Sequence, residues 1–128
     1  MRNAEAWRLI SIDMFERIKI FFGIFPTFGG VPRSSRWSSV RRQHLQLHPT
    51  CAVCETKKNL SVHHLKPYNK FPESELLPSN LSTLCESAGM NCHITFGHLG
   101  NFKFYNSNAS EDIKIWNEKF RQRLPNAV

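Results

Sequence analysis

Residues 51–67 read CAVCETKKNLSVHHLKP, and this stretch decides the fold that we expect for the chain. In its second half, the apolar residues Leu60 and Val62 alternate with polar residues, which is typical of a β-strand. The strand leads to two adjacent histidines, His63 and His64, whose side chains should point to opposite sides. One histidine can then bind a metal while the other faces elsewhere, so a role for both in one site requires a bend or a groove.

Four cysteines form two local pairs, Cys51 with Cys54 and Cys85 with Cys92. Two residues separate the first pair, so one tight turn can present both thiolates to a tetrahedral ion. Six residues separate the second pair, so the loop between them must bulge out. We recognise no secretory signal that would place these cysteines in an oxidising compartment. The spacing predicts one structural Zn²⁺ on four thiolates, which leave no open coordination position; the alternative is a set of buried cysteines without a metal.

The chain is basic, because its 128 residues include 17 Lys and Arg against 10 Asp and Glu, a formal charge of +7. Such an excess favours a polyanionic partner, and nucleic acid is the commonest one. Ribosomal and membrane-surface proteins share this property, so the charge narrows the partner without naming an activity. The apolar run at residues 18–28 is interrupted and far shorter than the roughly 20 apolar residues that a membrane span needs. We therefore expect a soluble, cytoplasmic protein without a membrane partner.

The length suits one compact domain with an appendage, since two ordinary domains would each need a core of their own. Between Trp7 and Phe22, apolar residues recur at steps of three and four, which predicts an amphipathic helix. Residues 25–32, with two glycines and two prolines, then break regular structure. We expect residues 1–32 to form this helix and a linker, and residues 33–128 to form the domain.

Two further helices are expected within the domain. The first begins near Ser34 and is terminated by Pro49. Its arginines suit phosphate contacts, whereas the alternative is a solvated charged face; they are Arg33, Arg36, Arg41 and Arg42. Ser110, followed by two acidic residues, resembles the N-cap of a closing helix. The apolar face of that helix would carry Ile113, Trp116 and Phe120.

The order of motifs from Ser34 to about Trp116 resembles the HNH family of nucleases, specifically the zinc-bound subgroup typical of phages and bacteria. The motifs that carry the resemblance are C-x-x-C at 51–54, V-H-H-L-x-P at 62–67, S-N-L-x-x-L-C at 79–85 and C-H at 92–93. The resemblance implies an α+β fold, a ββα-metal (His-Me finger) module on the zinc site with flanking helices. Its parts would be a two-stranded ribbon from about residue 60 to residue 67, a loop, and a helix after Cys92.

The resemblance also assigns roles to individual residues. His63 resembles a ligand of a catalytic divalent metal, and His64 matches the general base that takes a proton from the attacking water. Asn80 matches the asparagine that orients the base through hydrogen bonding and shapes the loop. His93 matches a metal ligand on the helix, and His98 is a further candidate ligand. The spacing of five residues between these two requires an irregular turn, because a regular helix brings residues three or four apart onto one face.

These roles imply a hydrolase that cuts DNA phosphodiester bonds, by nicking or by double-strand cleavage. A neutral imidazole can activate water near neutral pH, and a cation stabilises the charge that develops on the phosphate. Imidazole ligands accept Mn²⁺, Ni²⁺, Co²⁺ or Zn²⁺, whereas Mg²⁺ prefers oxygen ligands, so the working metal stays open. DNA is the expected partner. The settings open to such an enzyme are phage packaging with terminase, a mobile element and restriction, in a bacterium or a phage-infected host.

The alternative from another class is a non-catalytic, zinc-stabilised module that binds nucleic acid, in which the histidines are structural. It accounts for the cysteines and the arginines but gives no reason for His64 and Asn80 to accompany them. A nuclease toxin with the same motif is a second alternative, which would need a cognate inhibitor and a delivery domain. Nicking of plasmid by the purified protein, abolished by a chelator, separates the enzyme from the binding module.

Overall fold

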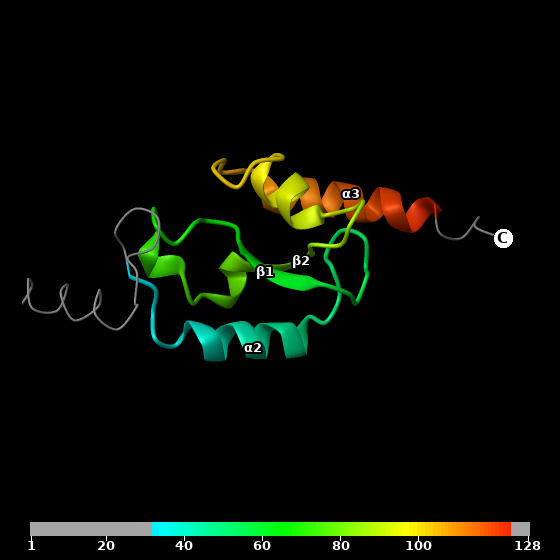
Figure 1. The fold of residues 1–128 in the computed structure, drawn as a ribbon. Helices are drawn as coiled ribbons and strands as arrows, with labels where there is room; N and C mark the ends of the chain where they lie inside the picture. Colours follow the sequence, from blue (N-terminus) through cyan, green and yellow to red (C-terminus); the bar gives the residue numbers. More distant parts are fainter. Residues whose placement is uncertain (1–31, 124–128) are drawn as a thin grey trace, which may run out of the picture. The chain divides into compact units, whose positions relative to one another are not determined.

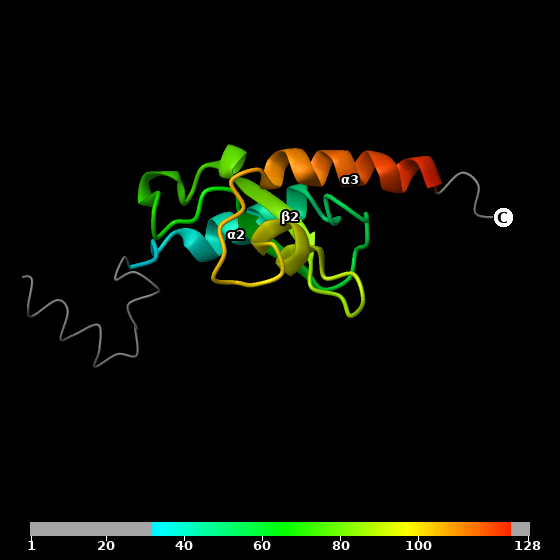
Figure 2. The same ribbon diagram turned by 90° about the horizontal axis from the view of Figure 1, so that it is seen from above.

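The computed structural model describes residues 32–123, which form helices on both sides of a two-stranded antiparallel sheet (Figure 1, Figure 2). This mixture agrees with the expected α+β class. Apart from Pro32, the predicted N-terminal helix and linker lie outside the described residues. Within residues 32–123, every helix is too short or too polar to span a bilayer. The elements in chain order are α2 (Trp37–Leu47), β1 (Leu60–His64), the 3-10 turns η1 (Pro72–Ser74) and η2 (Pro78–Asn80), β2 (Leu81–Cys85), the π-helix η3 (His93–Gly97) and α3 (Ala109–Arg123).

The two strands of the sheet are far apart in the sequence. β1 pairs with β2 along its whole length, with Leu60 opposite Cys85. The ribbon predicted for about residues 60–67 therefore contains only β1, and the prediction is wrong for the second strand. The physical reason is that a long loop leaves the sheet and is closed by a backbone hydrogen bond, in which the N–H of Leu65 donates to the carbonyl of Asn80 over 2.8 Å. The partner strand can begin only after this closure.

Each face of the ribbon carries one of the two adjacent histidines. Residues directly opposite each other in an antiparallel pair share a face, so His64 lies with Leu81 and Val62. His63 lies with Ser82 on the other face. The helix α2 packs on the first face, and η3 lies on the second with α3 beside it (Figure 1). The expectation that the two histidines point to opposite sides is confirmed.

The helix α2 is the one predicted for the arginine segment, although it begins later than expected. Its buried Trp37 packs against Val62 and Leu81 of the ribbon in a small apolar cluster. The helix ends at His48, whose backbone leaves the helical region. The following Pro49 explains this end, because a proline disfavours helical geometry in the residue before it. The buried residues of α2 are Trp37 and His44, and its arginines remain exposed.

The larger hydrophobic cluster surrounds the cysteines. Leu84 and Val53 are fully buried at its centre, and α3 contributes Ile113. The side chain of Asn117 on α3 donates to the carbonyl of Val53 over 3.0 Å, which ties this helix to the cysteine turn. The cysteines that belong to the cluster as buried residues are Cys51, Cys85 and Cys92. The core therefore has sulfur atoms where a larger domain would have aliphatic side chains.

The helix α3 begins at Ala109, so Ser110 lies inside its first turn and the N-cap predicted there is wrong. The buried Asn106 organises the start instead, because its side-chain oxygen accepts the N–H of Asn108 over 3.0 Å. Of the predicted apolar face, Trp116 is 43% exposed and packs near Phe96, with ring centroids 5.7 Å apart. The helix therefore packs along a narrower face than its sequence suggests.

The buried position of Leu84 predicts the first mutational effect. In the metal-loaded protein, Leu84→Ala should lower the free energy of unfolding by about 2–5 kcal/mol, because it leaves a cavity that the strands cannot fill. Leu47→Ala is the matched control, since that side chain is 69% exposed, and it should change the free energy by less than about 0.5 kcal/mol. Urea denaturation followed by circular dichroism measures both. Equal losses would contradict the assignment of Leu84 to the core.

Candidate metal centres

Four thiols from three separate segments of the chain converge on one point. Cys51 and Cys54 belong to a turn, Cys85 ends β2, and Cys92 directly precedes η3. Their sulfur atoms all lie within 4.8 Å of one another, and those of Cys54 and Cys85 are 3.7 Å apart. Tetrahedral zinc with Zn–S bonds of about 2.3 Å separates its ligand sulfurs by about 3.8 Å. The predicted ligands therefore fit a structural metal ion such as zinc.

The protonation of these thiols also favours a bound cation. The pKa of Cys51 is lowered to about 4, chiefly because the thiol of Cys92 donates a hydrogen bond to its sulfur. The backbone N–H of Cys85, 3.4 Å from the same sulfur, adds to this effect. Burial raises the pKa of Cys54 to about 11, so the four thiols cannot all ionise at neutral pH by themselves. A metal resolves this conflict, because it deprotonates the thiols that it binds.

A second cluster lies on the η3 side of the ribbon and consists of His63, His93 and His98. His63 belongs to β1, His93 is the first residue of η3, and His98 directly follows η3. The ring centroids are 5.2 Å apart for His63 and His93, 4.9 Å for His63 and His98, and 5.1 Å for His93 and His98. One nitrogen of each ring lies within 4.8 Å of the others. The structure therefore brings together the three predicted ligands of a second divalent metal.

The spacing of five residues between His93 and His98 is explained by the π-helix. In this helix each N–H bonds to the carbonyl five residues earlier, so positions five apart lie on one face. The helix predicted after Cys92 is thus a short π-turn and not a regular α-helix. The side-chain oxygen of Asn91 accepts the N–H of Ile94 over 3.2 Å and holds the start of the turn. Isolated π-turns occur frequently at functional sites.

Hydrogen bonds to the rings show which nitrogens face the centre of the cluster. Nδ1 of His93 donates to the carboxylate of Glu86 over 2.8 Å, and Nδ1 of His98 donates to the carbonyl of Phe104 over 3.0 Å. A nitrogen that donates to such an acceptor carries the proton, so the lone pair of the neutral ring is on Nε2. Nε2 of His63 is buried and, within the described part of the chain, has no hydrogen-bond partner. His93 and His98 therefore offer Nε2, and a metal would satisfy the buried Nε2 of His63.

Two histidines of this cluster, His63 and His98, have lowered pKa values. Burial lowers the pKa of His63 to about 3, and the charges of His93, His98 and His64 lower it further. Burial also lowers the pKa of His98. Both rings are consequently neutral at pH 7, so protons compete weakly for the nitrogens that would bind the metal.

Gly97 allows the ring of His63 to approach η3. A Cβ atom at this position would lie 2.9 Å from two atoms of that ring, closer than real side-chain contacts. Neither Gly97 nor Glu86 was among the predicted site residues. A glycine directly before the histidine was a signal for Gly97, whereas nothing in the sequence distinguishes Glu86 from other acidic residues in loops.

His64 lies on the α2 face of the ribbon, outside the three-histidine cluster. Its ring centroid is 4.5 Å from that of Trp37 and 6.0 Å from that of Tyr68. Its Nε2 is 2.9 Å from the carbonyl oxygen of Glu75. Because a carbonyl can only accept, Nε2 carries the proton and the basic lone pair of the neutral ring is on Nδ1.

Asn80 is buried and clamps the loop that follows β1. Its side-chain oxygen accepts the N–H of Lys66 over 2.7 Å, and its Nδ2 donates to the carbonyls of Lys66 and Ser74 at 3.0 and 2.9 Å. Ser74 is followed by Glu75, whose carbonyl accepts from His64. Asn80 therefore holds the loop segment that orients His64, and it acts on that ring through the backbone.

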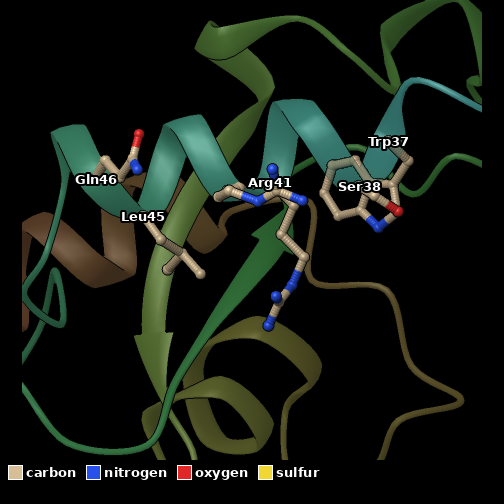
Figure 3. Close-up of a pocket in the computed structure, with 6 residues that line it drawn as sticks. Trp37, Ser38, Arg41, Leu45 and Gln46 are labelled. Carbon is tan, nitrogen blue, oxygen red and sulfur yellow. The ribbon is translucent and has the colours of Figure 1, made fainter.

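The four predicted DNA-binding arginines lie on α2 or just before it, and all are exposed. Arg41 and Arg42 line a hollow of about 440 Å³ (Figure 3). Trp37 lines the same hollow and its ring also lies 4.5 Å from that of His64, between centroids. The other residues that line the hollow are Ser38, Leu45 and Gln46.

Comparison with known protein families, with curated proteins and with solved structures finds no match to this chain. The chemistry of the two centres and of the surface around them is therefore the basis for assigning a function. The cysteine centre is structural by its ligand set, since four thiolates fill a tetrahedral ion. Three histidines leave coordination positions open, which is typical of a metal that takes part in catalysis.

Loss of one thiol should disrupt the cysteine centre. Cys85→Ser should lose most of the zinc affinity and lower the melting temperature, because metal binding contributes directly to the folding free energy. Met90→Ser in the adjoining bulge is the control, since this side chain is 42% exposed and is not among the four thiols. Metal analysis and thermal melting by circular dichroism measure the two effects. Stoichiometric zinc and unchanged melting in Cys85→Ser would contradict the site.

The carboxylate of Glu86 should strengthen the histidine centre. Glu86→Ala removes the acceptor that orients His93, so it should weaken binding of Ni²⁺ by about 10- to 100-fold. Titration calorimetry of the zinc-loaded protein with Ni²⁺ measures the affinity. Glu73→Ala, at an exposed carboxylate on η1, is the control and should leave it unchanged. Equal affinities of the two variants would show that Glu86 does not support the metal ligands.

Proposed function

We propose that this protein is a metal-dependent endonuclease of the HNH type that hydrolyses phosphodiester bonds of DNA. The observation that carries the proposal is the convergence of three imidazoles, with one nitrogen of each ring within 4.8 Å of the others, in His63, His93 and His98. The adjacent His64, whose protonated nitrogen is held by a carbonyl, adds a group suited to proton transfer. A module that only binds DNA has no need of either feature.

The residues around the phosphate would have separate roles in hydrolysis. When bound by the histidine cluster, a divalent metal supplies a Lewis acid for the phosphate and the leaving oxygen. His64 takes the proton of the attacking water at Nδ1. Its Nε2–H, held by the carbonyl of Glu75, keeps the ring in this tautomer and stabilises the charge that the ring gains. Asn80 is a positioning residue, because it fixes the loop that contains this carbonyl.

The two faces of the ribbon come together where β1 ends. His64 is the last residue of the strand, and its partner Leu81 is the first residue of β2. The sheet has only two strands, so a phosphate at this end can meet the metal side and the His64 side without crossing a wide surface.

The surface next to His64 suits the DNA backbone. Arg41 and Arg42 line a hollow that shares Trp37 with the His64 environment. Guanidinium groups pair well with phosphate oxygens, and such contacts position DNA without reading its sequence. We infer that the arginines of α2 bind the DNA backbone. A neighbouring phosphate of that backbone then lies at the end of the ribbon where β1 ends.

Because His64 and His63 have different proposed roles, replacing each should impair a different step. His64→Ala should keep metal and DNA binding but lose nicking of supercoiled plasmid by about 100- to 10,000-fold, because the base is missing. His63→Ala should bind metal weakly and should regain part of its activity at higher Mn²⁺ concentration, which His64→Ala should not. Gel separation of nicked from supercoiled plasmid, with and without chelator, measures the rates.

His48→Ala is the matched control, since this histidine is exposed beyond the end of α2 and should leave nicking unchanged. A His64→Ala protein that nicks at the wild-type rate would remove this residue as the base. A wild-type protein that binds DNA but cuts none with Mg²⁺, Mn²⁺, Ni²⁺ or Zn²⁺ would favour the non-catalytic binding module.

A further inference from the structure

The loop of residues 99–105, here called the aromatic loop, is attached to the histidine cluster at two points. The ring of Phe102 lies 5.5 Å from that of His93 and 5.1 Å from that of His98, between centroids. The carbonyl of Phe104 accepts the hydrogen bond from Nδ1 of His98 over 3.0 Å. The position of this loop is therefore coupled to the rings that would bind the metal.

The backbone of the aromatic loop is a defined turn. Leu99 and Gly100 both have positive φ angles, of 54° and 89°, which reverse the chain directly after His98. A positive φ is unfavourable for leucine and persists only where the surroundings enforce it. The N–H of Gly100 donates to the carbonyl of Ile94 over 2.8 Å, and that of Phe104 donates to the carbonyl of Asn101 over 2.8 Å. The turn thus presents its side chains in one arrangement.

Those side chains are apolar, yet they face solvent. Phe102 is 57% exposed and Phe104 is 55% exposed, with the exposed Lys103 between them. The other phenylalanines among residues 32–123 are Phe71, Phe96 and Phe120, and each of these is partly buried. Single exposed apolar residues are common, but two aromatic rings and a lysine beside a candidate metal centre are a composition suited to a nucleobase and its phosphate.

The loop after β1 adds positive charge beside the aromatic loop. The ring of its Phe71 lies 6.2 Å from that of Tyr105, between centroids. The amino group of Lys66 lies 5.7 Å from the ring of Phe71, and that of Lys70 lies 5.5 Å from the ring of Tyr105. Basic and aromatic side chains therefore alternate across both loops, a combination that binds single-stranded nucleic acid through stacking and charge.

We propose that the aromatic loop stacks Phe104 on an unpaired base of the DNA strand held at the histidine cluster, with Lys103 on a neighbouring phosphate. This inference rests on the proposed function and names its preferred substrate, a DNA strand with unstacked bases at the cut site. A fully paired duplex buries its bases and offers no such face unless it is distorted. Phe102 supports the loop against the ligand rings, and Phe104 makes the contact with the base.

The test compares two forms of one DNA duplex, fully paired or with a short unpaired bubble, and uses zinc-loaded full-length protein without added catalytic metal. The wild type should bind the bubble more tightly than the paired form, and Phe104→Ala should lose about tenfold affinity for the bubble alone, the scale of one base–aromatic stack. Phe104→Trp should restore the preference, because indole also stacks. Trp116→Ala, at an exposed aromatic on α3, is the matched control and should keep it.

A second readout needs no variant. Photo-crosslinking of wild-type protein to 5-iodouracil in the bubble should label residues 99–105, as mapped by mass spectrometry. An unchanged bubble preference in Phe104→Ala, or a crosslink that maps elsewhere, would overturn the inference. A wild-type protein that binds and nicks DNA but does not distinguish bubble from duplex refutes this inference alone, whereas absence of DNA binding refutes the proposed function with it.

Discussion

The convergence of four cysteine thiols is the constraint on which the rest of the described structure depends. It joins a turn before β1, the end of β2 and the start of η3, and the apolar cluster around Leu84 packs about it. The turn is also tied to β2 by the N–H of Ala52, which donates to the carbonyl of Thr83 over 2.8 Å. A domain of this size buries little apolar surface, so a metal on these thiols would contribute a large part of its folding free energy.

The same thiols position the second centre. Cys92 precedes His93, and Cys85 precedes Glu86, so each cysteine fixes the backbone next to one partner of the His93–Glu86 hydrogen bond. A ligand held on both sides by its chain neighbours and by a carboxylate loses little freedom when it binds a metal. A metal ion on the four cysteines would thus fix the backbone that positions the histidine cluster, although the two clusters share no residue.

The two-stranded ribbon places the adjacent residues His63 and His64 on opposite faces. One face presents His63 to the ligand cluster, and the other presents His64 to Trp37 and to the carbonyl of Glu75. If both histidines act on one phosphate, as we propose, the phosphate must lie where β1 ends. The exposed arginines of α2 and the lysines of the neighbouring loops would then surround the DNA backbone, in agreement with the basic composition of the chain.

The sequence by itself indicated the four-cysteine cluster, because C-x-x-C spacing is typical of a zinc site, and it pointed to His63, His93 and His98 through the resemblance. It also predicted α2 from the segment that Pro49 terminates, β1 from alternating apolar residues, and the approximate position of α3. It did not determine the second strand or the place of His64, since β2 is recognised only by its pairing across a long loop. The helix expected after Cys92 is a π-turn, in which the ring of His63 packs so close to Gly97 that a Cβ there would lie 2.9 Å from it. The positions of Glu86 and of the aromatic loop beside the histidine cluster are likewise visible only in the tertiary structure. Their partners are distant in the chain or are brought together only by an irregular turn.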